Sequence, residues 1–306
     1  MRFSVEYPIG SPGFDRQLLE PAVMSSFVAD LERMGIDSVA FTEHPAPSKK
    51  WLEGGGHEAL DPLTALAYCA ATTTTIKLFT YLLVLPYRNP LLAAKQIATT
   101  DVLSGGRTII GVGGGYLRSE FAALGVEFDD RNELTDEALR VLTSLWKTDS
   151  YSADDVGFRA VDLVSVPKPV QLPHPPIWIG GNSKIARDRV AKYGQGWAPL
   201  ITTPLMSSTT RTAAIESVAE LATAITDLRE RVEKEGRDPA EIDVQVQWNE
   251  ASHILGDPAE ALKRLESLAD AGVTWLCLNP PNGDVRRCLE LLAAYCDEVV
   301  SQARDL

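Results

Sequence analysis

The sequence predicts an α/β fold, a single (β/α)8 TIM barrel domain over residues 1–306 with insertions. Three observations lead to it. The chain has 306 residues, of which 45% are hydrophobic, enough for one large core. Eight short apolar runs recur along it, and stretches of helical periodicity separate most of them. Several runs lack the alternation of a half-exposed strand, as is typical of parallel strands covered on both faces. A doubly wound open sheet is the alternative.

The apolar runs give the expected strands in order, near residue 3 and from residues 38, 78, 108, 176, 196, 243 and 273. Helical spacing of three or four is clear between them. One example is Leu19, Val23, Phe27, Leu31 and Met34; another is Val285, Cys288, Leu292, Cys296 and Val299. Each strand is therefore expected to be followed by a helix.

Three segments exceed this repeat. Residues 151–176 hold an alternating stretch before a proline cluster and predict a hairpin inserted ahead of the fifth barrel strand. Residues 232–243 form a polar connection into the seventh strand. Residues 45–62 are long for a βα loop and contain three consecutive glycines. Loops of this length on a compact fold are usually functional.

Composition excludes several functions. The formal net charge is −13 and no stretch gathers basic residues, so nucleic acid is not an expected partner. The start lacks a signal peptide's apolar run and no later segment is long enough for a membrane span, which favours a cytoplasmic protein away from membranes. The scattered spacing of Cys69, Cys277, Cys288 and Cys296 argues against a zinc site or a disulfide framework and favours buried free thiols.

The pair Glu43 and His44 ends the second strand. Active sites of such barrels lie at the C-terminal ends of the strands, so this pair should face the catalytic cavity. The loop above it carries His57 and Glu58. Proton transfer by His44 is the preferred interpretation, and a core histidine bonded to a carbonyl is the alternative. No metal site is expected, because the first strand has no H-x-H pair.

Two glycine segments follow later strands. "GVGGGYLRSEF", 111–121, fails the dinucleotide fingerprint because Tyr116 occupies the third glycine position, so the usual NAD-binding fold is rejected. Its glycines allow either a close ligand approach or a tight turn. "PIWIGGNSK", 176–184, predicts a strand followed by a helix start, which suits either a phosphate or an ordinary helix cap.

Residues 82–131 and 167–199 carry a more specific signal. The pattern "SGGR-x-x-x-GVG-x-G" followed by "EF-x-x-x-G" resembles the bacterial luciferase-like superfamily, particularly its coenzyme F420-dependent branch. The resemblance implies a deazaflavin or flavin at the C-terminal face of the barrel and a non-prolyl cis peptide near Tyr81 and Leu82. The cofactor-binding residues that it implies are Tyr81, Leu82, Gly113, Gly114, Gly115, Gly180, Gly181, Asn182, Ser183 and Trp197, with the phosphate held at 180–183.

The resemblance further implies the chemistry. His44 would be the general acid or base during hydride transfer between F420 and a small organic substrate, and Glu43 would contact the cofactor or orient the imidazole. Tyr116 stands where sugar-phosphate-oxidising members carry glutamate, which makes it a candidate proton donor or pocket wall. The alternative is an FMN-dependent monooxygenase that uses O2 and receives reduced flavin from a reductase partner. A cofactor-storing paralogue is a third hypothesis. The family commonly forms homodimers.

Overall fold

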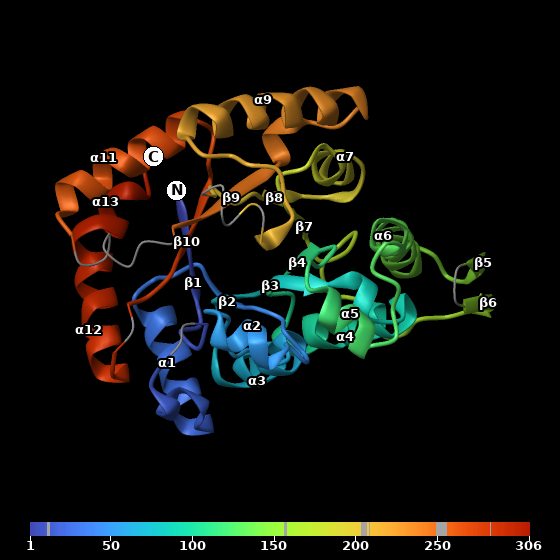
Figure 1. The fold of residues 1–306 in the computed structure, drawn as a ribbon, viewed down its shortest axis with the longest axis horizontal. Coiled ribbons are helices and arrows are strands. Elements are labelled where there is room, and N and C mark those ends of the chain that lie inside the picture. Colours follow the sequence, from blue (N-terminus) through green and yellow to red (C-terminus); the bar gives the residue numbers. More distant parts are fainter. Residues whose placement is uncertain (11–12, 156–157, 203–206, 208, 249–255, 282) are drawn as a thin grey trace.

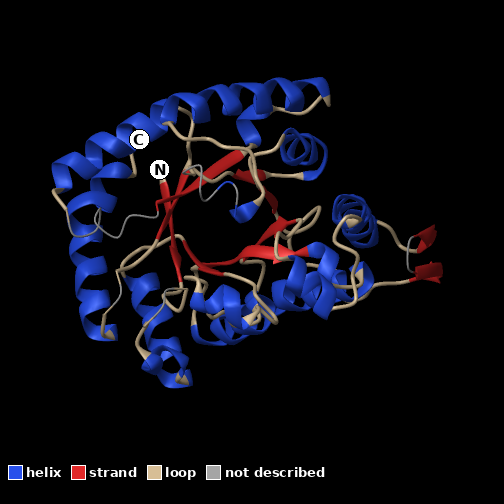
Figure 2. Cartoon of the chain, in the orientation of Figure 1, coloured by secondary structure: helices blue, strands red, loops and turns tan. Residues whose placement is uncertain are grey.

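Eight parallel strands close into a barrel surrounded by helices (Figures 1 and 2). The computed structural model describes all residues except 11–12, 156–157, 203–206, 208, 249–255 and 282. The barrel order is β1-β10-β9-β8-β7-β4-β3-β2, which confirms the predicted fold and all eight expected strands. The strands are β1 (Arg2–Glu6), β2 (Ser38–Phe41), β3 (Lys77–Val84), β4 (Thr108–Gly113), β7 (Ile177–Gly180), β8 (Gly196–Ala198), β9 (Asp243–Trp248) and β10 (Trp275–Leu278).

The helices pack around the outside of the barrel. Proline at the first turn and a side-chain cap begin several of them; Asp61, Asn89 and Asp257, for example, each accept a hydrogen bond from a backbone N–H of the first turn. The helices are α1 (Pro21–Arg33), α2 (Lys49–Glu53), α3 (Pro62–Thr72), α4 (Pro90–Ser104), α5 (Arg118–Ala123), α6 (Arg131–Lys147), α7 (Lys184–Tyr193), α9 (Val218–Lys234), α11 (Pro258–Asp270), α12 (Val285–Tyr295) and α13 (Ser301–Ala303).

The predicted hairpin is present between β4 and β7. It consists of β5 (Tyr151–Asp155) and β6 (Phe158–Leu163), which pair antiparallel. Figure 1 shows this hairpin projecting at the edge of the molecule, away from the barrel. It therefore lengthens one connection without interrupting the barrel, in which β4 pairs directly with β7.

The core has two parts. Aromatic side chains from the strands form one cluster. In it the centre of the Trp178 ring lies 5.0 Å from that of Phe79 and 5.2 Å from that of Trp275, and both contacts are edge to face. A larger apolar cluster includes residues from both strands and helices. The four cysteines are buried and free, as predicted. Of the described helices, none is sufficiently long and apolar to cross a bilayer.

The register between β3 and β4 shifts between Thr80 and Leu83, where the Tyr81–Leu82 peptide bond is cis. This is the position that the family resemblance implied. The irregularity lies at the C-terminal half of β3, beside the cavity described next.

Candidate active site

A cavity of about 400 Å³ lies at the C-terminal ends of the barrel strands. Eight of the residues predicted for the site line it, namely Glu43, His44, Tyr81, Leu82, Gly113, Gly115, Tyr116 and Gly181. A larger hollow of about 960 Å³ lies near the opposite ends of the strands, beside Arg2, Asp243 and Thr274. Only the first cavity lies where barrels of this kind carry their chemistry.

His44 is held by a carboxylate that is distant in sequence. Its Nδ1 lies 3.2 Å from Oε2 of Glu120, and the two side chains are 8% and 1% exposed. Glu120 also accepts hydrogen bonds from the Tyr87 hydroxyl at 3.0 Å and from the Ala46 backbone N–H at 3.2 Å. A carboxylate on Nδ1 favours the proton on that nitrogen and leaves Nε2 as the acceptor.

Two further titratable side chains adjoin His44. The Tyr116 hydroxyl lies 3.5 Å from Nε2, at the outer limit for a hydrogen bond. Burial raises the pKa of Tyr116 to about 12, with the Glu120 carboxylate adding to the effect, so this phenol stays protonated. The His57 ring meets His44 edge to face at 4.9 Å, and burial lowers the pKa of His57, which keeps it neutral.

Glu43 serves a different partner. Its carboxylate forms a two-pronged ion pair with Arg88 and accepts the backbone N–H of Val84 at 2.6 Å. These bonds join the tip of β2 to the end of β3 and to the segment after it. Glu43 and His44 therefore have different partners, and Glu120 occupies the orienting position suggested for Glu43.

The long loop after β2 covers the imidazole. The Trp51 ring, on the short helix α2, lies 4.5 Å from the His44 ring. A side chain at Gly56 would place its Cβ 2.2 Å from the Trp51 ring, so this glycine lets the loop close against the indole. The three consecutive glycines seen in the sequence thus include one that is required by packing.

Gly113 and Gly115 form another part of the wall. A Cβ at Gly115, where φ is +73, would lie 2.7 Å from Val84. Gly180 does not line the cavity; a Cβ there would lie 2.1 Å from the Leu82 side chain, which packs against this glycine. A Cβ at Gly113 would lie 3.4 Å from Leu82, and a Cβ at Gly114, which does not line the cavity, would lie 3.5 Å from the Thr135 hydroxyl. The glycine-rich wall leaves room for a flat ring against Leu82, which fits a flavin or deazaflavin.

The segment expected to bind a phosphate, residues 180–183, is held in place by hydrogen bonds within the protein. The Asn182 amide donates to the carbonyls of Leu200 and Ala213 and accepts from the Leu200 N–H, each at 2.8 Å. Ser183 caps α7, and the buried Trp197 indole donates to the Gly181 carbonyl at 2.9 Å. These side chains shape the loop after β7, and the helix-cap alternative is present at Ser183.

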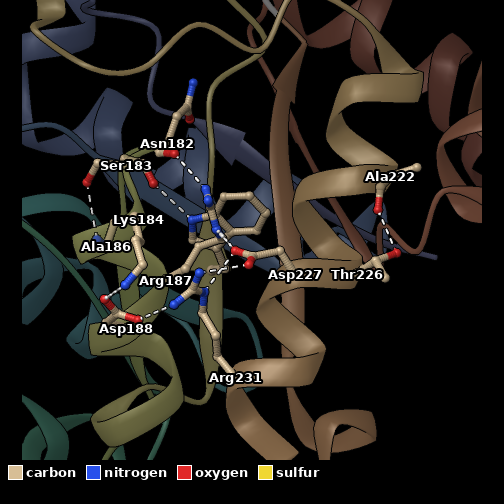
Figure 3. A network of polar contacts seen from close by, with 12 residues as sticks. Asn182, Ser183, Lys184, Ala186, Arg187, Asp188, Ala222, Thr226, Asp227 and Arg231 are labelled. Carbon is tan, nitrogen blue, oxygen red and sulfur yellow. Dashed lines mark hydrogen bonds and ion pairs between the residues drawn. The ribbon is translucent and has the colours of Figure 1, made fainter.

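Helices α7 and α9 are clamped beside this loop (Figure 3). Arg187 donates to the Asn182 carbonyl at 2.8 Å and to Asp227 at 2.6 Å, while Arg231 donates to both Asp227 and Asp188. The two arginines lower the pKa of Asp227 to about 2, with the Arg231 hydrogen bonds as the largest cause. The network therefore holds α7 and α9 together and, through the bond to Asn182, fixes the orientation of the loop.

Three guanidinium groups gather around one ring near the glycine segment. Arg118 and Arg131 each lie 4.1 Å from the centre of the Phe128 ring, and Arg211 lies 5.5 Å from it. Arg211 directly precedes Thr212, whose hydroxyl accepts the Asn182 N–H. Arg118 also pairs with Asp129 at 3.0 Å, so within this cluster the guanidinium groups of Arg131 and Arg211 best suit an anionic cofactor side chain.

The model for luciferase-like monooxygenases matches residues 1–276. The chain belongs to this family. No group of three or more potential metal-ligating side chains gathers among the residues that the structure describes.

Curated relatives of the family differ in cofactor. The chain is 38% identical over 125 residues to the FMNH2-dependent dimethylsulfone monooxygenase of Pseudomonas putida, a match covering 40% of this chain and 34% of that enzyme. It is 27% identical over 262 residues to the F420-dependent glucose-6-phosphate dehydrogenase of Kineococcus radiotolerans, covering 83% of this chain and 70% of that enzyme. The family thus includes F420-dependent and FMN-dependent enzymes.

Solved structures share the fold over nearly the whole chain. The monooxygenase RslO1 from Streptomyces bottropensis superposes with a TM-score of 0.79 at 19% identity, covering 99% of each chain. An F420-dependent secondary alcohol dehydrogenase bound to an F420-acetone adduct gives 0.77 at 16% identity, covering 99% of this chain and 98% of that one.

Sequence reasoning assigned no role to Glu120, Arg88, Glu6 or Gln247. Glu120 lies within the "EF-x-x-x-G" pattern, and an acidic residue beside a buried phenylalanine in a short helix was the available signal. Glu6 is the last residue of β1, just as Glu43 and His44 lie directly after β2. Its position at the C-terminal end of a strand was therefore a signal that it could belong to the site.

Proposed function

We propose that this family member is an oxidoreductase that transfers a hydride between coenzyme F420 and a small organic substrate, either an alcohol and its carbonyl or an activated double bond. The observation that carries the proposal is the bond between His44 and Glu120, which leaves the imidazole Nε2 as a proton acceptor beside the cavity. The carboxylate stabilises the imidazolium that forms when His44 takes a proton.

In the oxidising direction, His44 Nε2 removes the proton from the substrate hydroxyl, and in the reducing direction it returns a proton to the same position. Bound F420 would accept or supply the hydride. Tyr116, protonated and near the same nitrogen, would donate a hydrogen bond to the substrate oxygen. Leu82 and the glycine wall would hold the ring, and the Phe128 arginine cluster would hold the anionic side chain.

Support for F420 comes from the match to an F420-dependent dehydrogenase over 83% of this chain. A second candidate is an FMN-dependent monooxygenase using O2, favoured by the 38% identity over 125 residues to an FMNH2-dependent enzyme. Homodimer formation, a reductase partner and a cytoplasmic location stay predictions.

Calorimetric titration of the purified protein with F420 and with FMN tests the proposal. Binding of F420, followed by its reduction with a secondary alcohol, is the expected result. Binding of FMN alone, with O2 consumption when reduced FMN is supplied, would overturn F420 use and support the second candidate.

A further inference from the structure

A second polar group lines the cavity and is separate from the His44 and Glu120 pair. Glu6 ends β1, and its side chain is buried, with the residue 7% exposed. The Gln247 amide, from β9, donates to Glu6 Oε2 at 2.5 Å. Within the described part of the chain, no other side chain donates a hydrogen bond to this carboxylate.

Among the residues that the structure describes, no cation compensates Glu6. Burial raises its pKa to about 7, and the Gln247 hydrogen bond opposes that rise only in part. The titratable groups that act on or are acted on by Glu6 are the Cys277 thiol and the Tyr81 phenol, whose pKa values burial raises well above their ordinary ranges. Both are therefore neutral, and the nearby His57 has a lowered pKa.

The rest of the cavity has the same character. Its described lining residues include no lysine or arginine, and the segments outside the described residues contain neither in their sequence. Arg88, close behind Glu43, is already engaged by that carboxylate. An anionic substrate group would thus meet acidic side chains without a cationic partner.

Acceptors predominate in the hydrogen-bonding pattern of the pair. One N–H of Gln247 Nε2 bonds to Glu6, which leaves its second N–H as a donor and its amide oxygen as an acceptor. Glu6 Oε1 is a further acceptor whenever the carboxyl is ionised. Polar atoms that line a cavity are commonly satisfied by a ligand or by water. A ligand group that donates hydrogen bonds, such as an ammonium or a hydroxyl, complements the two acceptors, and a hydroxyl can also accept from the second N–H of Gln247.

We propose that Glu6 and Gln247 form a specificity subsite, which binds a hydroxyl or ammonium group of the substrate and rejects carboxylates and phosphates. The inference rests on the proposed oxidoreductase function, since the bound molecule is the one whose proton His44 transfers. It excludes sugar phosphates as substrates on the basis of charge.

Gly10 offers a second way to perturb the subsite. A Cβ at this position would lie 2.7 Å from Glu6 Oε1 and 3.9 Å from His57 Nδ1. Gly10→Ala therefore places a methyl group against the carboxylate without changing its charge. Glu298→Gln, at an exposed position between α12 and α13, is the matched control for loss of one negative charge.

The test uses three probes that share a secondary alcohol and differ in one terminal group, namely 1-amino-2-propanol, 1,2-propanediol and lactate. Each is titrated calorimetrically into the protein with and without cofactor, at pH 8. We expect the amino alcohol and the diol to bind at least about tenfold more tightly than lactate. Glu6→Gln should weaken only the amino alcohol by about tenfold, and Gly10→Ala should weaken both.

Equal binding of lactate and the amino alcohol, an unchanged amino alcohol affinity in Glu6→Gln, or no binding of any probe would each overturn the subsite. Cofactor titration of the same variants separates the two proposals. If neither F420 nor FMN binds while the probes keep the expected order, the oxidoreductase function fails and the subsite stands as a binding site.

Discussion

His44 Nδ1 and Glu120 Oε2 lie 3.2 Å apart, although 76 positions separate the two residues in the chain. The contact joins the tip of β2 to the first turn of α5. It gives the imidazole a fixed tautomer and a neighbouring negative charge, the two properties that a general base requires.

His44→Ala should lower kcat by about a hundredfold to ten-thousandfold, because it removes the group that moves the substrate proton. Cofactor affinity, measured by calorimetry, should change little. His57→Ala is the informative comparison, since it removes a neighbouring imidazole that lacks the carboxylate partner. Full turnover in His44→Ala would reject the assigned role.

Glu120→Gln should reduce kcat by about tenfold to a hundredfold while KM changes less, because the imidazolium loses its stabilising charge. Cofactor affinity, measured by calorimetry, should stay near the wild-type value, and this split between kcat and binding is one that a merely structural residue would not produce. Tyr87→Phe removes a hydrogen bond to Glu120 but keeps the carboxylate, so its kcat should stay near the wild-type value. An unchanged kcat in Glu120→Gln would contradict the positioning role.

The stability of the wild type should carry a pH dependence from Glu6. Its pKa in the folded protein is about 7, against an ordinary value of 4.5, so the folded state binds this proton more tightly than the unfolded state. The free energy of unfolding should therefore fall as pH rises from 4.5 to 7, by about 3 kcal/mol at most.

Glu6→Gln removes that titration. Urea unfolding of both proteins at pH 4.5 and pH 8 should show the variant gaining stability relative to the wild type at the higher pH. The comparison cancels the contributions of the other carboxylates. If the free energies of unfolding of the two proteins changed with pH in parallel, ionisation of Glu6 would not destabilise the folded state.

Gly115→Ala and Gly125→Ala form a matched pair for the glycine wall. Their φ angles are +73 and +72, so both substitutions incur similar backbone strain, about 1 kcal/mol. Only at Gly115 does the new Cβ clash with Val84 and Phe121; at Gly125 no atom lies within 4 Å. Gly115→Ala should thus lose more stability in urea unfolding and weaken cofactor binding. Equal effects at both positions would argue against a packed wall.

Much of the fold was predictable because the signals are local. Eight apolar runs and the alternating residues of the hairpin each reflect their own burial pattern, and His44 was placed at the cavity by its position after a strand. The cis bond at Tyr81 and Leu82 came from the family resemblance. None of these required knowing which distant side chains meet.

The partners of the site residues could not be derived in this way. Glu43 was adjacent to His44 in sequence, yet it bonds to Arg88, and the imidazole bonds to Glu120. Asn182 was expected at a phosphate, and its amide is occupied by the Leu200 and Ala213 backbone. Such pairings depend on how strand tips and helix starts converge in three dimensions, which periodicity does not encode.

The centre of the Trp51 ring lies 4.5 Å from that of the His44 ring, which places a fluorescent side chain beside the cavity. A ligand that enters the cavity beneath this loop changes the surroundings of the indole, so the emission of Trp51 should change on binding. The ring centres of Trp146 and His174 lie 5.7 Å apart in a second such pair, and Trp51→Phe identifies which part of the signal comes from the cavity. The loop that covers the imidazole thereby supplies an intrinsic fluorescent readout of ligand binding, without any label.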